Sequence, residues 1–234
     1  MKSEKRSRGV SEVVGYLLVF SIVVTIVSVI YASGMPMVER TKENSALQSM
    51  ETVFITLQSN IKKVALAQSP VRTMKLNLIK GSISANKTAG TITITVDGND
   101  ISIQFGNIEY TLGARKMIYE LGAVIESTPG GSIIVSDPPI FFTNSSGKAH
   151  VFISVINASG TFSAGGGIAE MQIGPYNVSR DTHVYYNSSP VTSLNISVTS
   201  QYQDAWDRYL NKEFGGFPIP SCNLTLVSHN VSIS

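Results

Sequence analysis

The first third of the chain is dominated by one long apolar run. From Val13 to Ala32, 20 consecutive residues carry no charge, and most are Val, Ile, Leu, Phe or Tyr. At about 1.5 Å per helical residue the run spans about 30 Å, which matches the hydrocarbon core of a bilayer. β-branched residues favour strands in water, but in lipid the backbone must satisfy its own hydrogen bonds, so a helix is predicted. Four basic residues precede the run and predict a cytoplasmic start, with everything after Gly34 outside.

A second helical pattern follows the apolar run. Gly34-Met35-Pro36 interrupts the first pattern, and we expect a kink or a short melted stretch there because proline lacks an amide donor. Helix then resumes and is expected to end near Gln68, before Ser69-Pro70. An apolar stripe with spacings of three and four residues runs along it: Leu47, Met50, Phe54, Leu57, Ile61 and Val64. The stripe either packs on the chain's own following domain, which we favour, or forms a seam between subunits.

Beyond Pro70 the hydrophobic period changes from helical to two. Residues 91–96 and 101–105 alternate around Asp97-Gly98, the pattern of a β-hairpin. Further strands are predicted at 108–112, 116–125, 131–136, 149–156, 167–173, 183–186, 193–199 and 222–228. One exception is a pattern of period four at Tyr202, Trp206 and Leu210, which predicts a short helix over 201–213 whose aromatics fill the core. The predicted fold is α+β, a long N-terminal helix followed by a β-rich, antiparallel, sandwich-like head.

Composition excludes several classes of function. The 234 residues carry a formal net charge of +2, too little to indicate a nucleic-acid partner. Cys222 is the single cysteine, so neither an internal disulfide nor a thiolate cluster is expected. His150, His183 and His229 lie far apart without a metal-binding spacing, and no Gly-rich segment is followed by the Lys-Ser/Thr of a phosphate loop. We therefore expect no enzyme, no cofactor and no metal.

Glu12 is the residue that separates three interpretations of the N-terminal segment. A secretory signal would end at the small residues 32–34, but its apolar core is usually about 7–15 residues, shorter than this run. A permanent, unprocessed anchor fits the length. Neither explains why a carboxylate, Glu12, lies at the edge of the apolar run. Burial of a carboxylate in lipid is costly, and residues of this kind usually have a function.

The third interpretation rests on a resemblance. Arg8-Gly9 followed by Val10-Ser11-Glu12-Val13-Val14-Gly15 resembles the class III signal peptide of archaeal type IV pilins, although many members carry Pro where this chain has Glu12. Segments 119–124, 135–139 and 163–167 also look like parts of archaeal pilin heads. The resemblance implies that a membrane prepilin peptidase cuts between Gly9 and Val10 and leaves the apolar run on the mature protein.

The resemblance also implies an organisation and a set of partners. Residues 1–9 are the cleaved leader, residues 10–69 the long helix (apolar half 10–34, amphipathic half 37–68), and residues 70–234 the extracellular head. The precursor waits in the membrane until an assembly platform with its ATPase stacks the apolar helices into a homopolymeric adhesion filament at the cell surface. Alternatives are a minor pilin or pseudopilin, and a membrane-anchored surface binding protein that does not polymerise.

Two further hypotheses concern individual side chains. Cleavage would create an α-amine on Val10, which we expect to pair with the Glu12 carboxylate of a neighbouring subunit; the alternative is a Glu12 hydrated at the membrane interface. N-linked glycans are expected on the head, where every Asn-x-Ser/Thr sequon after residue 70 is a candidate. These sequons begin at Asn86, Asn144, Asn157, Asn177, Asn187, Asn195, Asn223 and Asn230.

Overall fold

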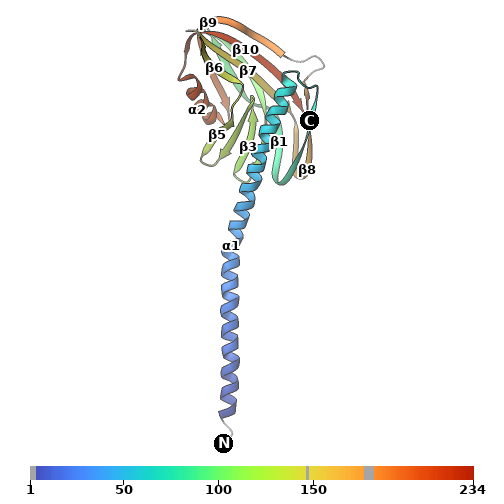
Figure 1. Ribbon diagram of the computed structural model, residues 1–234, viewed down its shortest axis with the longest axis vertical. Coiled ribbons are helices and arrows are strands. Elements are labelled where there is room, and N and C mark those ends of the chain that lie inside the picture. Colours follow the sequence, from blue (N-terminus) through green and yellow to red (C-terminus); the bar gives the residue numbers. More distant parts are fainter. Residues whose placement is uncertain (1–3, 146–147, 177–181) are drawn as a thin grey trace. The chain divides into compact units, whose positions relative to one another are not determined.

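The computed structural model describes residues 4–145, 148–176 and 182–234, with side chains described from residue 13 onward except at 145. These described residues form a long helix, α1, nine strands, a second helix, α2, and a last strand, β10 (Figure 1). It forms two compact units, one ending at Ser45 and one beginning at Ala46, and each is described by itself. The boundary lies within α1, so the last part of this helix belongs to the same unit as the strands.

Helix α1 runs without interruption from Glu4 to Ala65. The short melted stretch expected at Gly34-Met35-Pro36 is wrong, because the helix continues through Pro36, while the alternative of a kink there stays a prediction. A proline removes one backbone donor, but the hydrogen bonds on either side of it hold the helix together. The helix ends in a turn in which Ala67 takes a left-handed backbone conformation, φ 64°, and the Gln68 amide donates to the Lys63 carbonyl at 2.8 Å. This turn satisfies carbonyls that the last helical turn leaves without partners.

The strands form a single ten-stranded sheet. Their bounds are β1 Arg72–Val96, β2 Asn99–Leu112, β3 Arg115–Glu120, β4 Ala123–Thr128, β5 Gly131–Ser136, β6 Ile140–Ser145, β7 Lys148–Gly160, β8 Phe162–Pro175, β9 Thr182–Ser200 and β10 Ile219–Ile233. The predicted α+β class is confirmed. The predicted strand 116–125 is in fact two, because Leu121 and Gly122, with φ 49° and 86°, make a tight hairpin turn. The sequence pattern missed β6 and the first half of β1.

The sheet folds over on itself because β1 is long enough to take part in two regions. Residues 72–85 of β1 pair with β8, while residues 90–96 pair with β9 on one side and β2 on the other. Strand β9 also pairs with β10, and β10 runs parallel to β7. Gly106 of β2 lies so close to β7 and β1 that a Cβ there would come 2.3 Å from the Asn86 carbonyl oxygen. Only glycine permits this approach.

Two apolar cores lie on the two faces of the folded sheet. The helical stripe of α1 is fully buried against one face, so the interpretation that it packs on the chain's own head is confirmed. Each of these side chains contributes about 1.5–3 kcal/mol when buried. On the other face lies α2, Gln203–Phe214, which confirms the predicted short helix (Figure 1). Tyr202, Trp206 and Leu210 are at most 3% exposed and fill the second core, as the period-four pattern predicted.

Candidate functional site

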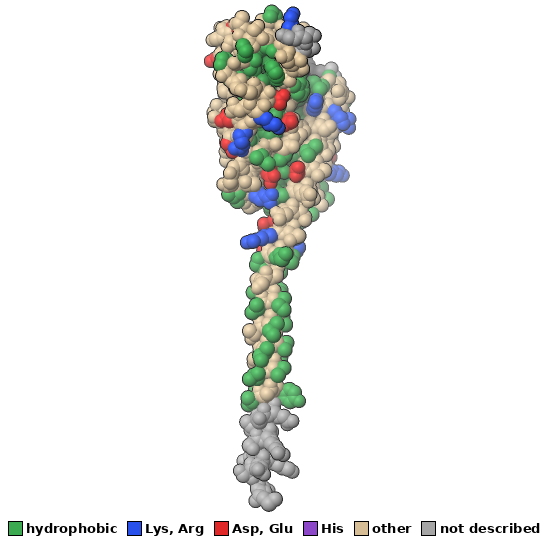
Figure 2. Space-filling model, turned by 60° about the vertical axis from the view of Figure 1, so that its left-hand side comes forward, with side chains coloured by type: hydrophobic (Ala, Val, Ile, Leu, Met, Phe, Trp, Pro, Cys, Tyr) green, Lys and Arg blue, Asp and Glu red, His purple; other side chains and the backbone are tan. Residues whose placement is uncertain are grey.

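The first half of α1 is an exposed apolar surface. Residues 13–38 contain no charged residue, and all of them are solvent-exposed in the structure. Figure 2 shows apolar side chains covering this segment. Within the described residues α1 is the single helix long and apolar enough to cross a membrane, and its most apolar 18-residue window has a mean hydropathy of 2.7. A continuous apolar patch of this size marks contact with lipid or with other protein.

Three hydroxyl groups on this surface are satisfied within the helix itself. Ser21, Thr25 and Ser28 each donate to the backbone carbonyl four residues earlier, with oxygen–oxygen distances of 2.7 Å. A hydroxyl bonded in this way needs no water. These three side chains therefore present no unsatisfied donor to an apolar environment.

The predicted processing and pairing residues lie at the start of the same helix. The backbone of Gly9 and Val10 belongs to α1. The side chains of Val10 and Glu12 lie outside the described residues, so their pairing stays a prediction. Cleavage after Gly9 likewise stays a prediction from the sequence.

The head holds the last part of α1 through a polar contact as well as the apolar stripe. The Gln58 amide nitrogen donates to the Gly122 carbonyl at 2.7 Å and to the Asp137 carbonyl at 3.0 Å. Its amide oxygen accepts from the Ser136 hydroxyl at 2.8 Å. Both ends of the amide are therefore used, which fixes the rotation of residues 54–61 about the helix axis. The apolar pattern did not single out Gln58, because a lone polar residue in an amphipathic helix gives no signal.

The predicted glycosylation sites fall into two groups. Four asparagines are exposed: Asn86, Asn144, Asn187 and Asn195. Asn195 lies in β9 and faces solvent. Three others, Asn157, Asn223 and Asn230, are half-buried, and Asn177 lies outside the described residues.

Asn157 and Asn230 are neighbours across the parallel pair of β7 and β10. The Asn157 amide nitrogen donates to the Asn230 side-chain oxygen at 3.0 Å, and the Asn157 oxygen accepts from the Gly106 amide at 3.0 Å. A sugar on the Asn157 nitrogen would displace this contact. The geometry therefore assigns Asn157 a structural role that a sequon pattern cannot reveal.

A buried carboxyl group, Glu120, lies between the sheet and α2. It has no exposed surface, and its two oxygens accept from Trp206 Nε1 at 3.2 Å and Asn107 Nδ2 at 3.5 Å. Burial raises the pKa of Glu120 to about 7, although hydrogen bonds from Trp206, Ser200 and Asn107 oppose the shift. Nothing in the sequence distinguished this glutamate from a surface residue.

A second carboxyl group, Glu109, lies nearby and behaves differently. Burial alone would raise its pKa, but hydrogen bonds from the Tyr202 hydroxyl and from Lys116, with Nζ 2.9 Å away, lower it overall. Glu109 therefore loses its proton at a lower pH than Glu120. Glu109 also raises the pKa of Glu120 through like-charge repulsion.

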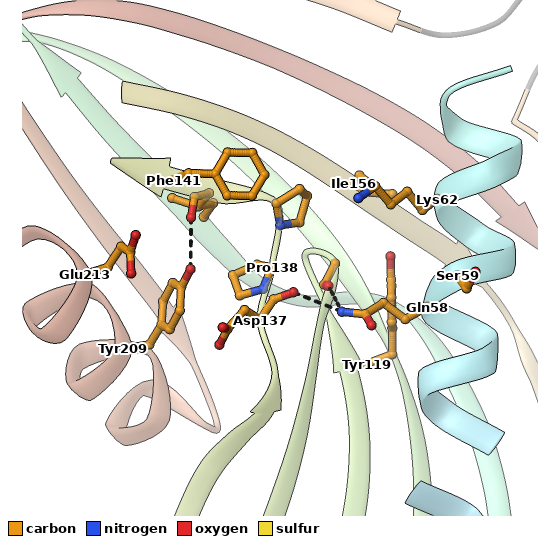
Figure 3. A pocket seen from close by; sticks show the side chains of 13 residues that line it. Gln58, Ser59, Lys62, Tyr119, Asp137, Pro138, Phe141, Ile156, Tyr209 and Glu213 are labelled. Atoms are coloured by element: carbon orange, nitrogen blue, oxygen red, sulfur yellow. Dashed lines mark hydrogen bonds between the residues drawn. The ribbon is translucent and has the colours of Figure 1, made fainter. Parts of the chain in front are cut away.

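A cavity of about 410 Å³ opens between the end of α1, the segment 137–141 and α2 (Figure 3). Its wall includes Gln58 and Lys62 from α1 and Tyr209 and Glu213 from α2. The Tyr209 hydroxyl donates to the Ile140 carbonyl at 2.9 Å and so fixes the wall on the α2 side. Sequence reasoning missed this cavity, since its residues are spread over 155 positions from Gln58 to Glu213.

The histidines and the cysteine form no site in the described part of the chain. No three His, Cys, Asp or Glu side chains there lie close enough to hold a metal ion. Cys222 is buried in β10, and burial raises the pKa of its thiol. Buried His229 has a lowered pKa for the same reason and contacts Thr182 Oγ1 at 3.1 Å.

Comparison with known proteins gives a family but no activity. The sequence profile described as "Family of unknown function (DUF7289)" matches residues 8–217, most of the chain. The chain belongs to this family. The region that defines DUF7289 thus includes the exposed half of α1, the cavity residues and α2, and it ends before β10.

One curated relative is similar over a shorter region. An uncharacterized protein of Archaeoglobus fulgidus is 28% identical over 82 residues, which cover 35% of this DUF7289 chain and 27% of that protein. The match thus spans about a quarter of the relative's length. No solved structure matches.

Proposed function

We propose that this DUF7289 protein is a structural subunit of an archaeal type IV pilus, which polymerises through α1 into an adhesion filament at the cell surface. The observation that carries the proposal is the division of α1 into two surfaces. Residues 13–38 are apolar and fully exposed, while the stripe from Leu47 to Val64 is buried on the chain's own head. A helix that already holds its own domain with one part has its other part free for lipid and then for other helices.

Exchange of lipid for neighbouring helices keeps this apolar surface out of water. Lipid and apolar side chains are similar environments, so close packing between helices supplies the gain. The β-branched residues and Gly15 give the segment a slim, rigid outline suited to such packing. The residues before it, Arg8-Gly9 and Val10-Ser11-Glu12, supply the resemblance to a prepilin cleavage site.

Two other observations agree with the proposal. The exposed sequons Asn86, Asn144, Asn187 and Asn195 lie on the part of the chain that would be outside the membrane, where N-linked sugars are added. The Archaeoglobus fulgidus protein that is similar over 82 residues comes from an archaeon. In this proposal the prepilin peptidase, the assembly platform and its ATPase act on the precursor at the membrane.

The first experiment is to determine the mature N-terminus of the protein from native cell envelopes, by intact mass and N-terminal sequencing. A start at Val10, together with filaments that contain the chain in electron micrographs, would support the proposal. A start near Met35, or an uncut Met1, would overturn it and favour a monomeric surface protein. A start at Val10 without filaments of this chain would favour a minor pilin.

The pairing of the Val10 amine with Glu12 is tested separately by Glu12→Ala. We expect filament assembly to fail or slow, since the new amine loses its anionic partner. Glu39→Ala is the matched control, because Glu39 lies past the apolar run on the exposed side of the same helix. Normal filaments from Glu12→Ala would contradict the pairing but not the filament proposal.

A further inference from the structure

The cavity between α1, the segment 137–141 and α2 has charged groups of opposite sign on opposite walls. Lys62 extends from α1 on one side, and Glu213 lies on α2 on the other (Figure 3). Among the described residues neither forms an ion pair: the salt bridges found there join Arg115 to Glu126, Lys116 to Glu109 and Arg208 to Asp204. Asp137 of the segment 137–141 also lines the cavity, so one ammonium group and two carboxylates are available to a ligand.

The floor between these two charges is apolar. Ile156 of β7 and Pro138, Pro139 and Phe141 line the cavity. Tyr119 also lines it, but this residue is fully buried and its hydroxyl has almost no accessible surface, so the hydroxyl is not open to a ligand.

The walls of the cavity are held in place before any ligand arrives. Gln58 binds the Gly122 and Asp137 carbonyls, and Tyr209 binds the Ile140 carbonyl. Burial raises the pKa of Tyr209, and the charges of Glu213 and Asp137 raise it further. A preformed cavity of this size, with an apolar floor and a few convergent polar groups, has the features of a small-molecule site.

We propose that this cavity binds a small zwitterion, an α-amino acid with an apolar side chain. The carboxylate of the ligand lies toward Lys62, its ammonium group lies toward Glu213, and its side chain covers Ile156 and Phe141. A ligand with one charge only would leave the opposite wall charge unpaired. The site belongs to the head alone, so it does not depend on whether the chain forms filaments.

Binding is tested on the full chain in detergent micelles by isothermal titration calorimetry and saturation-transfer NMR, with L-leucine and L-phenylalanine as probes. We expect saturable binding of at least one of them. Two analogues of the same amino acid serve as controls: the amine without the carboxylate, and the carboxylic acid without the ammonium group. Each should bind at least about tenfold more weakly than the amino acid.

Two pairs of variants locate the site. Lys62→Met and Glu213→Gln should each weaken binding by about tenfold or more, because each removes one charged hydrogen-bond partner. Lys63→Met and Asp207→Asn, on the same two helices but outside the cavity, should bind as the natural protein does. Equal unfolding transitions for all four variants would show that the effect is local.

Three results would overturn the proposal. The first is the absence of saturable binding of either amino acid at millimolar concentration. The second is binding that neither Lys62→Met nor Glu213→Gln weakens. The third is binding of neutral monosaccharides but not of amino acids, which would assign the cavity to carbohydrate.

Discussion

Trp206 of α2 donates its indole N–H to the carboxyl group of Glu120 at the end of β3, with 3.2 Å between Nε1 and Oε2. Neither side chain has any exposed surface. The contact joins the helix that fills one core to the strand that separates the two cores. Because Trp206 is the single tryptophan of the chain, its fluorescence reports directly on this contact.

Replacement of Glu120 by Gln should change how stability depends on pH. The native pKa of about 7 lies above the ordinary value of 4.5, so the native state holds more protons between these values. The free energy of unfolding therefore falls as pH rises from 4.5 to 7, by about 3 kcal/mol from this group, and stays level above. Glu120→Gln should lose this dependence, as measured by denaturant unfolding followed by Trp206 fluorescence.

The free energies of unfolding of the natural protein and of Glu120→Gln must be compared at each pH, since other groups titrate in the same range. Burial lowers the pKa of His229 below 6.5, so that group makes the native state more stable as pH rises toward 6.5. This contribution is present in both proteins and cancels in the difference. Glu170→Gln, an exposed site on β8, is the control. The same pH slope in Glu120→Gln as in the natural protein would rule out a buried neutral carboxyl.

Phe54→Ala should destabilise the head strongly. Phe54 has no exposed surface in the core between α1 and the sheet, so its truncation leaves a cavity and costs about 3–5 kcal/mol. The neighbouring Ile55 is 42% exposed, and Ile55→Ala should change stability by about 0.5 kcal/mol or less. Denaturant unfolding of both variants in micelles measures the difference. Equal losses at the two positions would contradict the packing of this part of α1.

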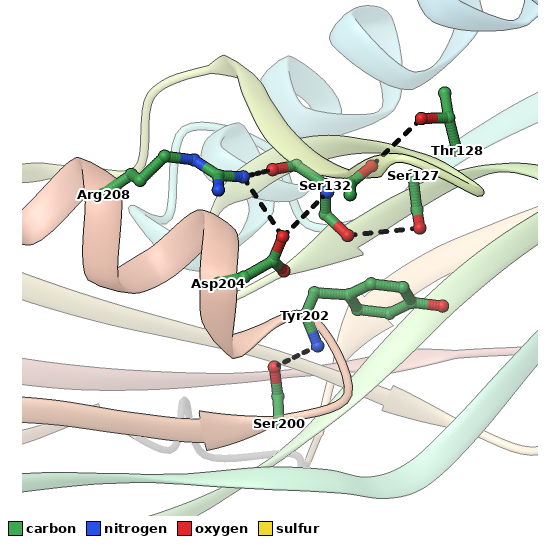
Figure 4. Close-up of polar contacts among 8 residues, drawn as sticks. Ser127, Thr128, Ser132, Ser200, Tyr202, Asp204 and Arg208 are labelled. Carbon is green, nitrogen blue, oxygen red and sulfur yellow. Dashed lines mark hydrogen bonds and ion pairs between the residues drawn. The ribbon is translucent and has the colours of Figure 1, made fainter.

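The outer edge of β5 is closed by two side chains of α2 (Figure 4). The Asp204 carboxylate accepts from the Ser132 amide at 2.9 Å, while Arg208 donates to the Ser132 carbonyl and to Asp204. The two side chains thus take the place of a neighbouring strand at this residue. The backbone N–H and C=O of Ser132 are therefore not free to pair with another chain.

Asp204→Asn or Arg208→Ala should therefore loosen this edge. We expect the Ser132 amide to exchange its hydrogen about fivefold faster, corresponding to about 1 kcal/mol or less for partly exposed groups. The hydrogen bond from the Ser132 backbone is the main reason that the pKa of Asp204 is lowered, so the natural protein should show the same loosening as pH falls through that pKa. Exchange followed by NMR or mass spectrometry measures it, with Asp207→Asn as control. Unchanged exchange at Ser132 would contradict the role of α2 at this edge.

Asn157→Ala should cost about 1–3 kcal/mol of stability. The Gly106 amide would lose its acceptor and Asn230 would lose a donor in a half-buried position between β2, β7 and β10. Asn195→Ala, at an exposed sequon, should leave stability within about 0.5 kcal/mol. Thermal unfolding of the two variants provides the measurement. A neutral Asn157→Ala, or a glycan on Asn157 in the native protein, would show that the contact is dispensable.

Local pattern was sufficient to predict the helices of this protein. The 20 uncharged residues from Val13 to Ala32, the stripe from Leu47 to Val64 and the period of four around Trp206 each determine a helix, because burial of one helical face follows directly from spacing. The change to a period of two after Pro70 determined the β-rich class of the head for the same reason.

Tertiary contacts decided the features that spacing does not encode. The first half of β1 has a period of two at Met74, Leu76 and Leu78 that sequence reasoning missed, and β6 gives no strong pattern because it begins directly after Pro138-Pro139. Strands β8 and β7 supply the partners of these two segments. The continuity of α1 through Pro36 depends on the helical residues on both sides of it.

The same limit applies to the candidate sites. The apolar surface of residues 13–38 and the sequons could be found from sequence, because each depends on neighbouring residues alone. The buried Glu120, the Asn157–Asn230 contact and the cavity between Lys62 and Glu213 each join residues at least 73 positions apart. Their burial, hydrogen bonds and pKa values arise only when the folded sheet and the two helices bring those residues together, and no local pattern carries that information.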